Sequence, residues 1–248
     1  MEPTEQPFFL ILGGGGGIGS ALARELHARG AALCLAGRDR QRLESAGSPL
    51  GAELAVLDAR HFDEVQDLVR ELLERRGRVD GIACCVGSIP LKPAHATSEQ
   101  ELREALEQNL FSAFAAVRAA GALLRERPAS VALVSSVAAS VGLANHEAIA
   151  AAKAGVEALA RSAAATYVGR SLRVNAVAPG LVRTPLAQRL LANPALEKAS
   201  AALHPLGRVG EPEEIARVLA WLLSAESSWV TGQVIHVDGG LSTLRSRA

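Results

Sequence analysis

The segment Phe8-Phe-Leu-Ile-Leu-Gly-Gly-Gly-Gly-Gly-Ile-Gly19 joins a continuous apolar run to a run of glycines, and a segment with helical periodicity, 18–29, follows it. The apolar run predicts a strand that is buried on both faces. Glycines between such a strand and a helix let backbone N–H groups and the helix N-terminus approach a pyrophosphate closely. The segment therefore predicts a dinucleotide-binding loop, and a flexible turn without a ligand is the alternative.

The same alternation of apolar runs and helical segments continues along the chain. Strands are expected at 8–12, 32–36, 53–57, 81–86, 131–135, 172–177 and 234–237, and helices at 18–29, 39–46, 62–76, 98–126, 147–168 and 211–224. Strands that are apolar throughout, rather than alternating, are typical of parallel sheets with helices on both faces. We therefore expect an α/β protein, a single doubly wound Rossmann-like domain over residues 1–248 with a parallel sheet of about seven strands.

Composition and charge argue against several function classes. Lys+Arg and Asp+Glu number 26 each and aromatic residues make up 3%, so nothing points to a nucleic-acid partner. No apolar run approaches the roughly 18–20 residues of a membrane span, and the acidic start is unlike a signal peptide, so we expect a cytoplasmic protein. The cysteines, Cys34, Cys84 and Cys85, have neither metal nor disulfide spacing, and no metal site is expected.

Residues 184–210 depart from the alternation. They carry prolines at 185, 194 and 205 and lie between the sixth expected strand and the last expected helix. Ligands bind at the carboxyl edge of such sheets, and long loops there are often functional. The segment therefore predicts a substrate lid. A plain surface excursion with two short helices is the alternative.

The end of the second strand indicates which dinucleotide is bound. Gly37 stands where an acidic side chain would bond the ribose hydroxyls of NAD, and Arg38 and Arg40 follow it. A guanidinium group suits a 2′-phosphate. The pattern favours NADP(H) over NAD(H), unless these arginines merely solvate the following helix.

Motifs along nearly the whole chain resemble the short-chain dehydrogenase/reductase family. They are Gly13-x-x-x-Gly17-Ile-Gly19, Asp58 after the third strand, EQNLFSAF around Asn109, VSSVAAS around Ser136, Lys153, NAVAPGLVRTPL, and the C-terminal GRVGEPEEIARVLAWLLSAESSWVTGQVIHVDGG. The resemblance implies a small-molecule oxidoreductase that assembles as a homodimer or homotetramer. It also implies catalytic roles for Ser136, Lys153 and Asn109. The expected cofactor-binding residues are Gly13, Gly15, Gly16, Gly17, Ile18, Gly19, Arg38, Asp58, Cys84, Val86, Gly87, Lys153, Pro179, Gly180, Val182 and Thr184.

Ile149 departs from the family pattern. It stands four residues before Lys153, where the family has a tyrosine that gives a proton to the carbonyl oxygen. Isoleucine has no proton to give. The single tyrosine of the chain, Tyr167, lies about 27 Å further along the same expected helix at 1.5 Å per residue. A lesser departure is Cys84-Cys85-Val86-Gly87, which replaces the family's Asn-Asn-Ala-Gly.

Several routes could make up for the missing acid. His146, three residues before Ile149, titrates near neutrality, although a helix N-terminus would keep it neutral. It could equally be a surface side chain beside Asn145. Water is a second route, and a third is a substrate that needs no protonated oxygen, such as an activated alkene. Ile149 itself could simply pack against the nicotinamide or the sheet.

Two functions remain open at this stage. The first is an NADP(H)-dependent oxidoreductase that acts on a small carbonyl, alcohol, C=N or C=C substrate, with His146 or water in place of the tyrosine. The second is a catalytically silent dinucleotide-binding protein, a sensor or a partner subunit. The presence of Asn109, Ser136 and Lys153 favours the first. Ser136 discriminates best, because Lys153 would bind the ribose in either protein, whereas a silent protein has no need of a hydroxyl that stabilises an oxyanion.

Overall fold

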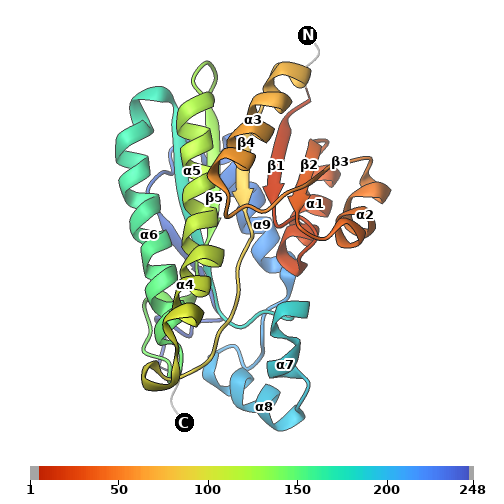
Figure 1. The fold of residues 1–248 in the computed structure, drawn as a ribbon. Helices are drawn as coiled ribbons and strands as arrows, with labels where there is room; N and C mark the ends of the chain where they lie inside the picture. Colours follow the sequence, from red (N-terminus) through yellow and green to blue (C-terminus); the bar gives the residue numbers. More distant parts are fainter. Residues whose placement is uncertain (1–5, 246–248) are drawn as a thin grey trace.

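The computed structural model of the protein describes residues 6–245, which build a sheet of seven parallel strands between layers of helices (Figure 1). The strands lie in the order β3-β2-β1-β4-β5-β6-β7. They are β1 (Phe8–Leu12), β2 (Ala32–Gly37), β3 (Glu53–Val56), β4 (Gly81–Cys84), β5 (Ala129–Val134), β6 (Leu172–Pro179) and β7 (Val234–Val237). The predicted doubly wound α/β fold is confirmed.

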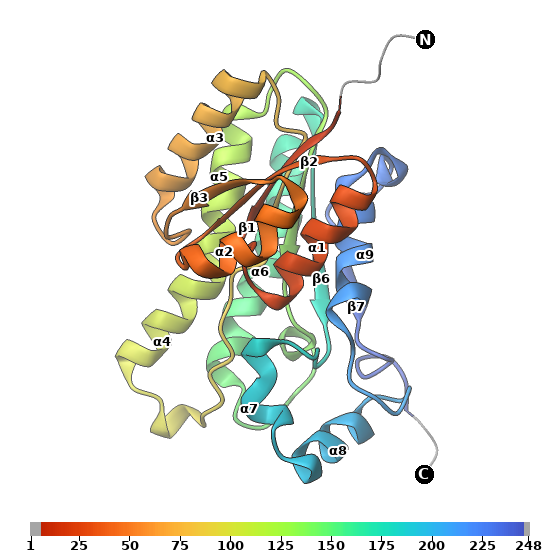
Figure 2. The ribbon, with the colours of Figure 1, turned by 90° about the vertical axis from the view of Figure 1, so that its right-hand side faces the viewer.

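Helices cover both faces of the sheet (Figure 2). The helices are α1 (Gly17–Ala28), α2 (Arg40–Gly47), α3 (Phe62–Arg76), α4 (Glu99–Leu106), α5 (Ser112–Leu123), α6 (Glu147–Tyr167), α7 (Gln188–Leu191), α8 (Pro194–Leu203) and α9 (Pro212–Leu223). In β1, Leu10 and Leu12 face the core beneath α3, α5 and α6, whereas Phe9 and Ile11 face the core beneath α1 and α9. Burial on both faces explains why the strands are apolar throughout.

The helix predicted over 98–126 is divided in the structure. α4 ends at Leu106, a π turn spans Glu107–Phe111, and α5 begins at Ser112. Asn109 lies buried in this turn and donates from Nδ2 to the carbonyl oxygen of Ala105 at 2.9 Å. The chain stays helical from Glu99 to Leu123, as the sequence predicts, but the apolar pattern continues through the π turn and does not reveal it. π turns occur frequently at functional sites.

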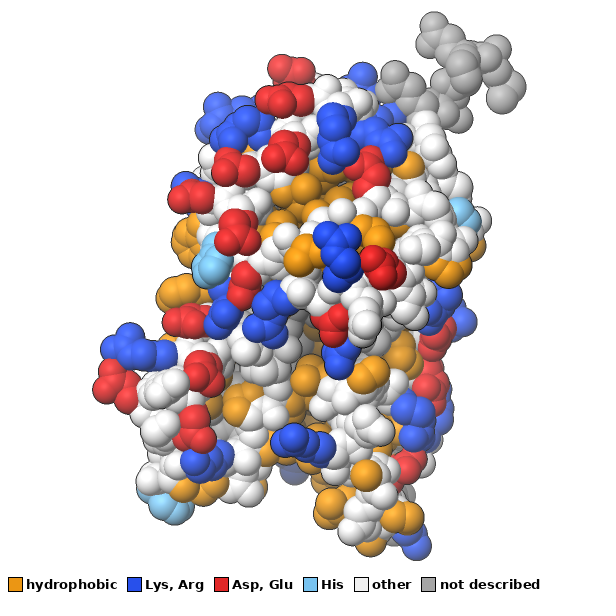
Figure 3. Space-filling model, turned by 45° about the vertical axis from the view of Figure 1, so that its right-hand side comes forward, with side chains coloured by type: hydrophobic (Ala, Val, Ile, Leu, Met, Phe, Trp, Pro, Cys, Tyr) orange, Lys and Arg blue, Asp and Glu red, His pale blue; other side chains and the backbone are white. Residues whose placement is uncertain are grey.

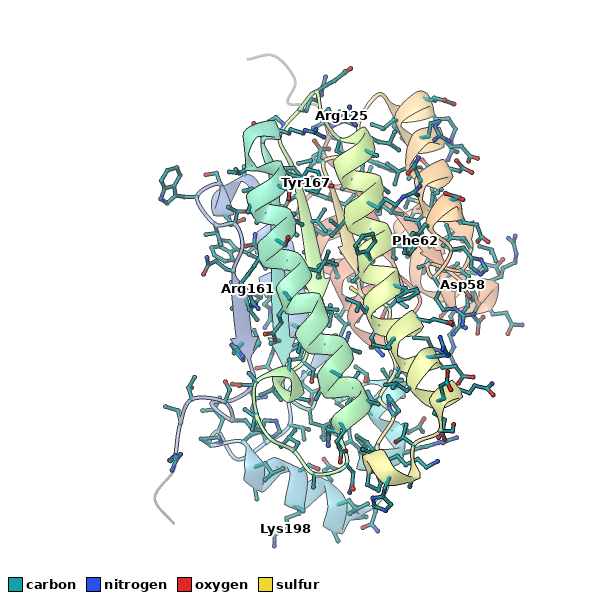
Figure 4. The ribbon with its side chains drawn as sticks, turned by 60° about the vertical axis from the view of Figure 1, so that its left-hand side comes forward. Asp58, Phe62, Arg125, Arg161, Tyr167 and Lys198 are labelled. Carbon is teal, nitrogen blue, oxygen red and sulfur yellow. The ribbon has the colours of Figure 1, made fainter. Side chains whose placement is uncertain are left out.

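α6 places the two ends of the predicted active-site segment far apart. Ile149 and Lys153 lie near its N-terminus, and Tyr167 is its last residue. Figure 4 shows Tyr167 at the opposite end of α6, beside α5, where its ring packs over Gly121. Tyr167 therefore cannot replace the missing tyrosine. Within residues 6–245, no helix combines the length and hydropathy needed to cross a membrane.

The 184–210 segment contains α7 and α8 and lies beyond the carboxyl ends of the strands (Figure 1). Pro185 and Pro194 each occupy the first turn of a helix, where proline is well tolerated. The space-filling view shows a recess at this end of the molecule, between the part that carries α4 and the 184–210 segment (Figure 3). The exposed leucines of the segment are Leu186, Leu196, Leu203 and Leu206.

Candidate active site

The glycine loop makes a tight turn between β1 and α1. The N–H of Gly13 donates to the carbonyl oxygen of Ala36 at 2.8 Å, with φ at +77°, which favours glycine. A side chain at Gly19 would overlap the Gly13 carbonyl oxygen. No side chain caps the start of α1, so its first N–H groups remain available to a ligand. The loop therefore fits the pyrophosphate of a dinucleotide.

The tip of β2 carries several arginines with different environments. Asp39 caps α2, accepting from the N–H of Arg42, and also pairs with the Arg42 side chain at 3.3 Å. Arg40 pairs with Glu44 at 3.9 Å. Arg38 is exposed, and it forms neither a hydrogen bond nor an ion pair with any residue between 6 and 245. Its guanidinium group is thus open to an anionic ligand.

Asp58 lies after β3 and is engaged by Arg60. The Arg60 Nη2 to Asp58 Oδ2 distance is 2.7 Å, and Nε also donates to the same carboxylate. The hydrogen bonds from Arg60 hold the pKa of Asp58 below its usual range, and the charge of Arg38 adds to this effect. Any contact of the Asp58 carboxylate with a bound dinucleotide would have to share this carboxylate with Arg60.

A cavity of about 440 Å³ lies at the carboxyl edge of the sheet, between α6 and the 184–210 segment. It brings together the predicted residues Ile18, Val86, Gly87, Asn109, Ser136, His146, Lys153, Pro179, Gly180, Val182 and Thr184. The other predicted residues Gly13, Gly15, Gly16, Gly17, Gly19, Arg38 and Asp58 lie outside its lining, along the ends of β1, β2 and β3. The predicted site residues therefore form two groups, one that lines the cavity and one that lies beside it along the ends of β1, β2 and β3.

Lys153 is the buried cation of the cavity. Its Nζ donates to the carbonyl oxygen of Val134 at 2.6 Å, and burial lowers its pKa to about 8. A Cβ atom at Gly87 would lie 2.9 Å from Asn109 Oδ1 and 3.4 Å from Lys153 Nζ. Glycine at this position therefore lets the β4 turn approach both polar side chains.

Asn109 is held by Ser88, which the sequence analysis missed. Asn109 Nδ2 donates to Ser88 Oγ at 3.0 Å, and Asn109 Oδ1 accepts from the Ser88 N–H at 3.2 Å. The signal for Ser88 in the sequence is its place directly after Gly87 at a strand end. Such a position is not enough to distinguish one loop serine from another.

Ser136 and Ser135 are adjacent in the chain but differ in environment. Ser136 Oγ accepts from the N–H of Ala138 at 3.2 Å, and its own proton bonds no group among residues 6–245. Ser135 Oγ lies 2.9 Å from Oε1 of the buried Glu157 and also contacts the carbonyl of Lys153. Ser136 can therefore donate to a ligand, whereas Ser135 is committed to the core.

Ile149 and His146 occupy the start of α6. The Ile149 side chain is buried against the cavity, and His146 is partly exposed at the helix N-cap. His146 Nδ1 lies 2.7 Å from the carbonyl oxygen of Ala144. Because a carbonyl can only accept, Nδ1 carries a proton, and Nε2 of the neutral ring is an acceptor. The neutral ring would therefore present a base at Nε2, whereas a protonated ring would donate from both nitrogens.

The side chain of Cys84, one of the cofactor-binding residues predicted from the sequence, does not face the cavity. Its side chain is buried in β4, with Sγ 3.8 Å from the hydroxyl of Ser112, and it does not line the cavity. Successive side chains of a strand point to opposite faces, so the next residue, Cys85, lines the cavity instead. Burial raises the pKa of both thiols. Among the described residues, no group of three His, Cys, Asp or Glu side chains could hold a metal ion.

His204 ties the 184–210 segment to the floor of the cavity. Its ring is buried, Nδ1 donates to the carbonyl of Ser200 at 2.8 Å, and Nε2 accepts from the N–H of Leu181 at 3.2 Å. Sequence reasoning missed it, because a single histidine before a proline carries no recognisable signal. Other cavity residues it missed are Cys85, Ile89, Leu91, Leu143, Leu181 and Leu241.

Comparisons with known proteins agree with this geometry. The family described as "Enoyl-(Acyl carrier protein) reductase" matches residues 14–242. The chain is 34% identical to a 3-oxoacyl-[acyl-carrier-protein] reductase of Thermotoga maritima, covering 94% of this chain and 96% of the relative. It is 35% identical to a 2,5-dichloro-2,5-cyclohexadiene-1,4-diol dehydrogenase of Sphingobium indicum, covering 98% and 100%.

Solved structures give the same result. A putative gluconate dehydrogenase from Agrobacterium tumefaciens superposes with a TM-score of 0.91 at 26% identity, covering 96% of this chain and 97% of that one. The structure titled gox2181 also has a TM-score of 0.91, at 30% identity and 96% coverage of both chains. The chain therefore belongs to the short-chain dehydrogenase/reductase family of NAD(P)-dependent oxidoreductases.

Proposed function

We propose that the protein is an NADP(H)-dependent oxidoreductase that transfers hydride between the nicotinamide and a small carbonyl, alcohol, C=N or C=C substrate. The observation that carries this proposal is the meeting of Ser136, Lys153 and Asn109 at one cavity beside the glycine loop. A bound nicotinamide would supply or accept the hydride. Ser136 would hold the substrate oxygen, and Lys153 and the Asn109–Ser88 pair would position the ligand around Gly87.

We assign proton transfer to and from the substrate to water or His146, because the Ile149 side chain has no proton to give. His146 lines the cavity with Nε2 as an acceptor, which suits it to take a proton in the oxidative direction. In the reductive direction, water would supply the proton. Loss of a positioned acid typically lowers a rate by about 10²–10⁴-fold, and a reductase with a favourable substrate can tolerate that loss.

The preference for NADP(H) rests on the tip of β2. Arg38 is open to a 2′-phosphate, while the nearby acidic side chain, Asp39, is engaged by the N-terminus of α2 and by Arg42. An acidic group that is already bonded is a poor partner for the ribose hydroxyls of NAD. A phosphate beside Arg38 would gain charge-assisted hydrogen bonds.

The alternative is a catalytically silent dinucleotide-binding protein, and Ile149 is the observation that favours it. Under that alternative the glycine loop and Lys153 would still bind the cofactor. Ser136 would have no role, since only a reacting oxygen needs its hydroxyl. Ser136 therefore distinguishes the two functions.

The test is NADPH oxidation by the purified protein with ketones, aldehydes, imines and activated alkenes, with Ser136→Ala alongside. We expect the variant to lose about 10²–10³-fold in kcat, the usual effect of removing one oxyanion donor. The NADPH dissociation constant should stay unchanged. Ser140→Ala is the matched control, because Ser140 lies in the same loop outside the cavity lining. A wild type that binds NADPH but turns over no compound would favour the silent protein.

We also propose that the chain assembles as a homodimer or homotetramer through the face formed by α3 and α5. Phe111 and Phe114 are each 45% exposed there. Phe62, labelled in Figure 4, stacks on Phe114 with ring centroids 5.5 Å apart. Large apolar side chains grouped on a surface indicate an interface. Light scattering of Phe111→Glu should show a smaller species than the wild type, whereas Leu206→Glu should not change the mass.

A further inference from the structure

Lys153 faces the cavity without a carboxylate partner. Its side chain is 4% exposed and lines the cavity at the carboxyl edge of the sheet. Lysine side chains are almost never buried to this extent unless an acidic group pairs with them. The lining contains no Asp or Glu side chain, and Lys153 forms no ion pair with any residue between 6 and 245. Burial without a counter-charge disfavours the ammonium form and favours the neutral amine.

The titratable groups around Lys153 do not compensate for this loss of hydration. They are the thiols of Cys84 and Cys85, the imidazoles of His146 and His204, and the carboxylate of Glu157 one turn further along α6. Burial raises the pKa of both thiols, so they stay protonated at neutral pH. An imidazole carries either no charge or a positive one. The Glu157 carboxylate accepts from the hydroxyl of Ser135 and not from Lys153. Burial accordingly lowers the pKa of Lys153 to about 8.

The nitrogen of Lys153 is held by a single hydrogen bond. Nζ donates to the carbonyl oxygen of Val134 at 2.6 Å, and its remaining N–H groups bond no residue between 6 and 245. A Cβ atom at Gly87 would lie 3.4 Å from Nζ, so glycine leaves space beside the nitrogen. Ile149, one turn before Lys153 on the same face of α6, presents hydrocarbon to it. The lone pair of the neutral amine is therefore open to a ligand in the cavity.

Hydroxyl groups of the cavity can hold the oxygen of such a ligand. Ser88, Ser136 and Ser200 line the cavity, and within the described part of the chain none of them donates its hydroxyl proton to another group. A hydroxyl that donates to a carbonyl oxygen stabilises the negative charge that develops there when a nucleophile attacks the carbon. The cavity therefore combines a nucleophilic nitrogen with donors for a carbonyl oxygen.

The walls of the cavity suit an uncharged ligand. Aliphatic side chains make up much of the lining, namely Ile89, Leu91, Leu143, Leu186, Leu190 and Leu203. A charged ligand would lose its hydration among them. An anionic ligand would also stabilise the ammonium form of Lys153, which has no lone pair and cannot attack, whereas an uncharged ligand leaves the amine neutral. The chemistry of the cavity therefore favours an apolar carbonyl compound.

We propose that Lys153 captures an uncharged aldehyde in this cavity as a reversible imine. Lysines that are desolvated in hydrophobic pockets are the ones that form Schiff bases. The nitrogen lone pair attacks the carbonyl carbon, the C=O π pair moves onto the oxygen, and one amine proton passes to that oxygen through solvent. The carbinolamine then loses its hydroxyl group and the second amine proton as water, and the C=N bond forms.

This capture is independent of the proposed hydride transfer, because imine formation consumes neither an oxidant nor a reductant. A bound dinucleotide whose ribose contacts Lys153 would compete with the aldehyde for the same nitrogen. The imine therefore forms in the protein without a dinucleotide, and its test needs no turnover of NADPH.

Reductive trapping of the wild-type protein tests the proposal. Benzaldehyde and sodium cyanoborohydride at pH 7 convert an imine into a stable benzylamine, and peptide mass spectrometry follows each lysine separately. An ordinary lysine is almost fully protonated at this pH, whereas a group with a pKa of about 8 is about one-tenth neutral. We expect the adduct at Lys153 to form about 10²-fold faster than at Lys198, which is exposed on α8. Comparable rates at the two lysines, or an adduct at Lys198 alone, would overturn the proposal.

The pH dependence separates loss of the proton from simple access to the nitrogen. Between pH 7 and pH 10 the neutral fraction of an ordinary lysine rises several-hundred-fold, whereas that of a group with a pKa of about 8 rises about 10-fold. The ratio of the trapping rates at Lys153 and Lys198 should therefore fall by at least about 10-fold over this range. A constant ratio would mean that Lys153 is not an unusually neutral amine and would contradict the proposal.

Substitution of Ile149 tests the physical cause. Ile149→Tyr and Ile149→Phe differ by a single hydroxyl, so the phenylalanine variant controls for the added ring volume. A phenol one turn from Lys153 can accept from the ammonium group and so stabilise its charged form. We expect trapping at Lys153 to be at least about 10-fold slower in the tyrosine variant than in the phenylalanine variant, with trapping at Lys198 unchanged. Equal rates at Lys153 would overturn the argument that its apolar surroundings make the amine reactive.

Discussion

Ile149 and Lys153 lie one turn apart on the same face of α6, and both side chains are buried at the cavity, with exposures of 3% and 4%. An ammonium group beside hydrocarbon has few groups to solvate it. Lys153 keeps the Val134 carbonyl as its hydrogen-bond acceptor. Replacement of the family tyrosine by isoleucine therefore removes an acid and also makes the surroundings of the neighbouring lysine less polar.

Lys153 should titrate near pH 8. Burial lowers its pKa from 10.5 to about 8, so the group is charged below that pH and neutral above it. The chain has three lysines, Lys92, Lys153 and Lys198, which makes isotope-labelled lysine spectra simple to assign. We expect one side-chain signal with a midpoint near pH 8 and its loss in Lys153→Met. A midpoint near the ordinary lysine value would contradict the burial argument. Lys198, exposed on α8 (Figure 4), provides a reference signal.

The same shift predicts how stability depends on pH. Between pH 8 and 10.5 the unfolded chain holds the Lys153 proton and the folded chain releases it, so stability rises with pH in this window. The full gain is about 3 kcal/mol. Urea unfolding at several pH values should show this rise in the wild type relative to Lys153→Met. If the free energy of unfolding changed with pH in the same way in both proteins, burial would not disfavour the charged form of Lys153.

Arg38→Ser should weaken NADPH binding selectively. Loss of the charge-assisted bonds to a 2′-phosphate should raise the NADPH dissociation constant by about 10–100-fold and leave that of NADH nearly unchanged. Fluorescence titration with both cofactors measures the difference. Arg40→Ser is the matched control, because Arg40 pairs with Glu44. If NADH and NADPH weakened equally, Arg38 would not be the selective group.

Asn109→Leu should destabilise the π turn by about 2–4 kcal/mol. The substitution removes the partners of the Ala105 carbonyl and of Ser88, leaving polar groups unpaired near the core. Urea unfolding measures the loss. Ser112→Ala removes one hydroxyl from the same region, which bonds the Gln108 carbonyl, and should cost about 1 kcal/mol. Equal losses in the two variants would mean that the Asn109 bonds contribute little.

His204→Leu should loosen the 184–210 segment. The variant lacks the acceptor for the Leu181 N–H and the donor to the Ser200 carbonyl. Hydrogen exchange should accelerate in α8 and at Leu181, with the sheet unchanged. His204→Gln can restore part of both bonds and should show a smaller effect, and the exposed His95→Leu should show none. Unchanged exchange in α8 would exclude His204 as the link.

Much of the fold could be predicted because its signals are local. Each strand is a short apolar run that begins within two residues of its expected position. The π turn at Glu107–Phe111 could not be predicted, since the apolar pattern of a helix continues through it. The contacts of Asn109 in this turn, with Ala105 and Ser88, are likewise not recorded in the pattern.

Only those residues of the candidate site that belong to recognisable sequence motifs could be predicted. Ser136, Lys153, Asn109 and His146 meet at the cavity as expected, whereas Cys84 points into the core. Ser88 and His204 were missed because their roles arise from contacts 21 and 23 residues away along the chain. No local pattern records such pairs.

The sequence by itself determined the order of strands and helices, the glycine turn after β1 and the absence of a phenol at position 149, because each is a property of residue identity and short spacing. The tertiary structure alone decided that β1 lies between β2 and β4, that Lys153 is buried, that the hydroxyl of Ser136 is open while that of Ser135 is bonded, and that His204 joins α8 to Leu181. These features depend on which distant segments pack together, since packing sets the burial and the hydrogen-bond partners of every side chain at the cavity.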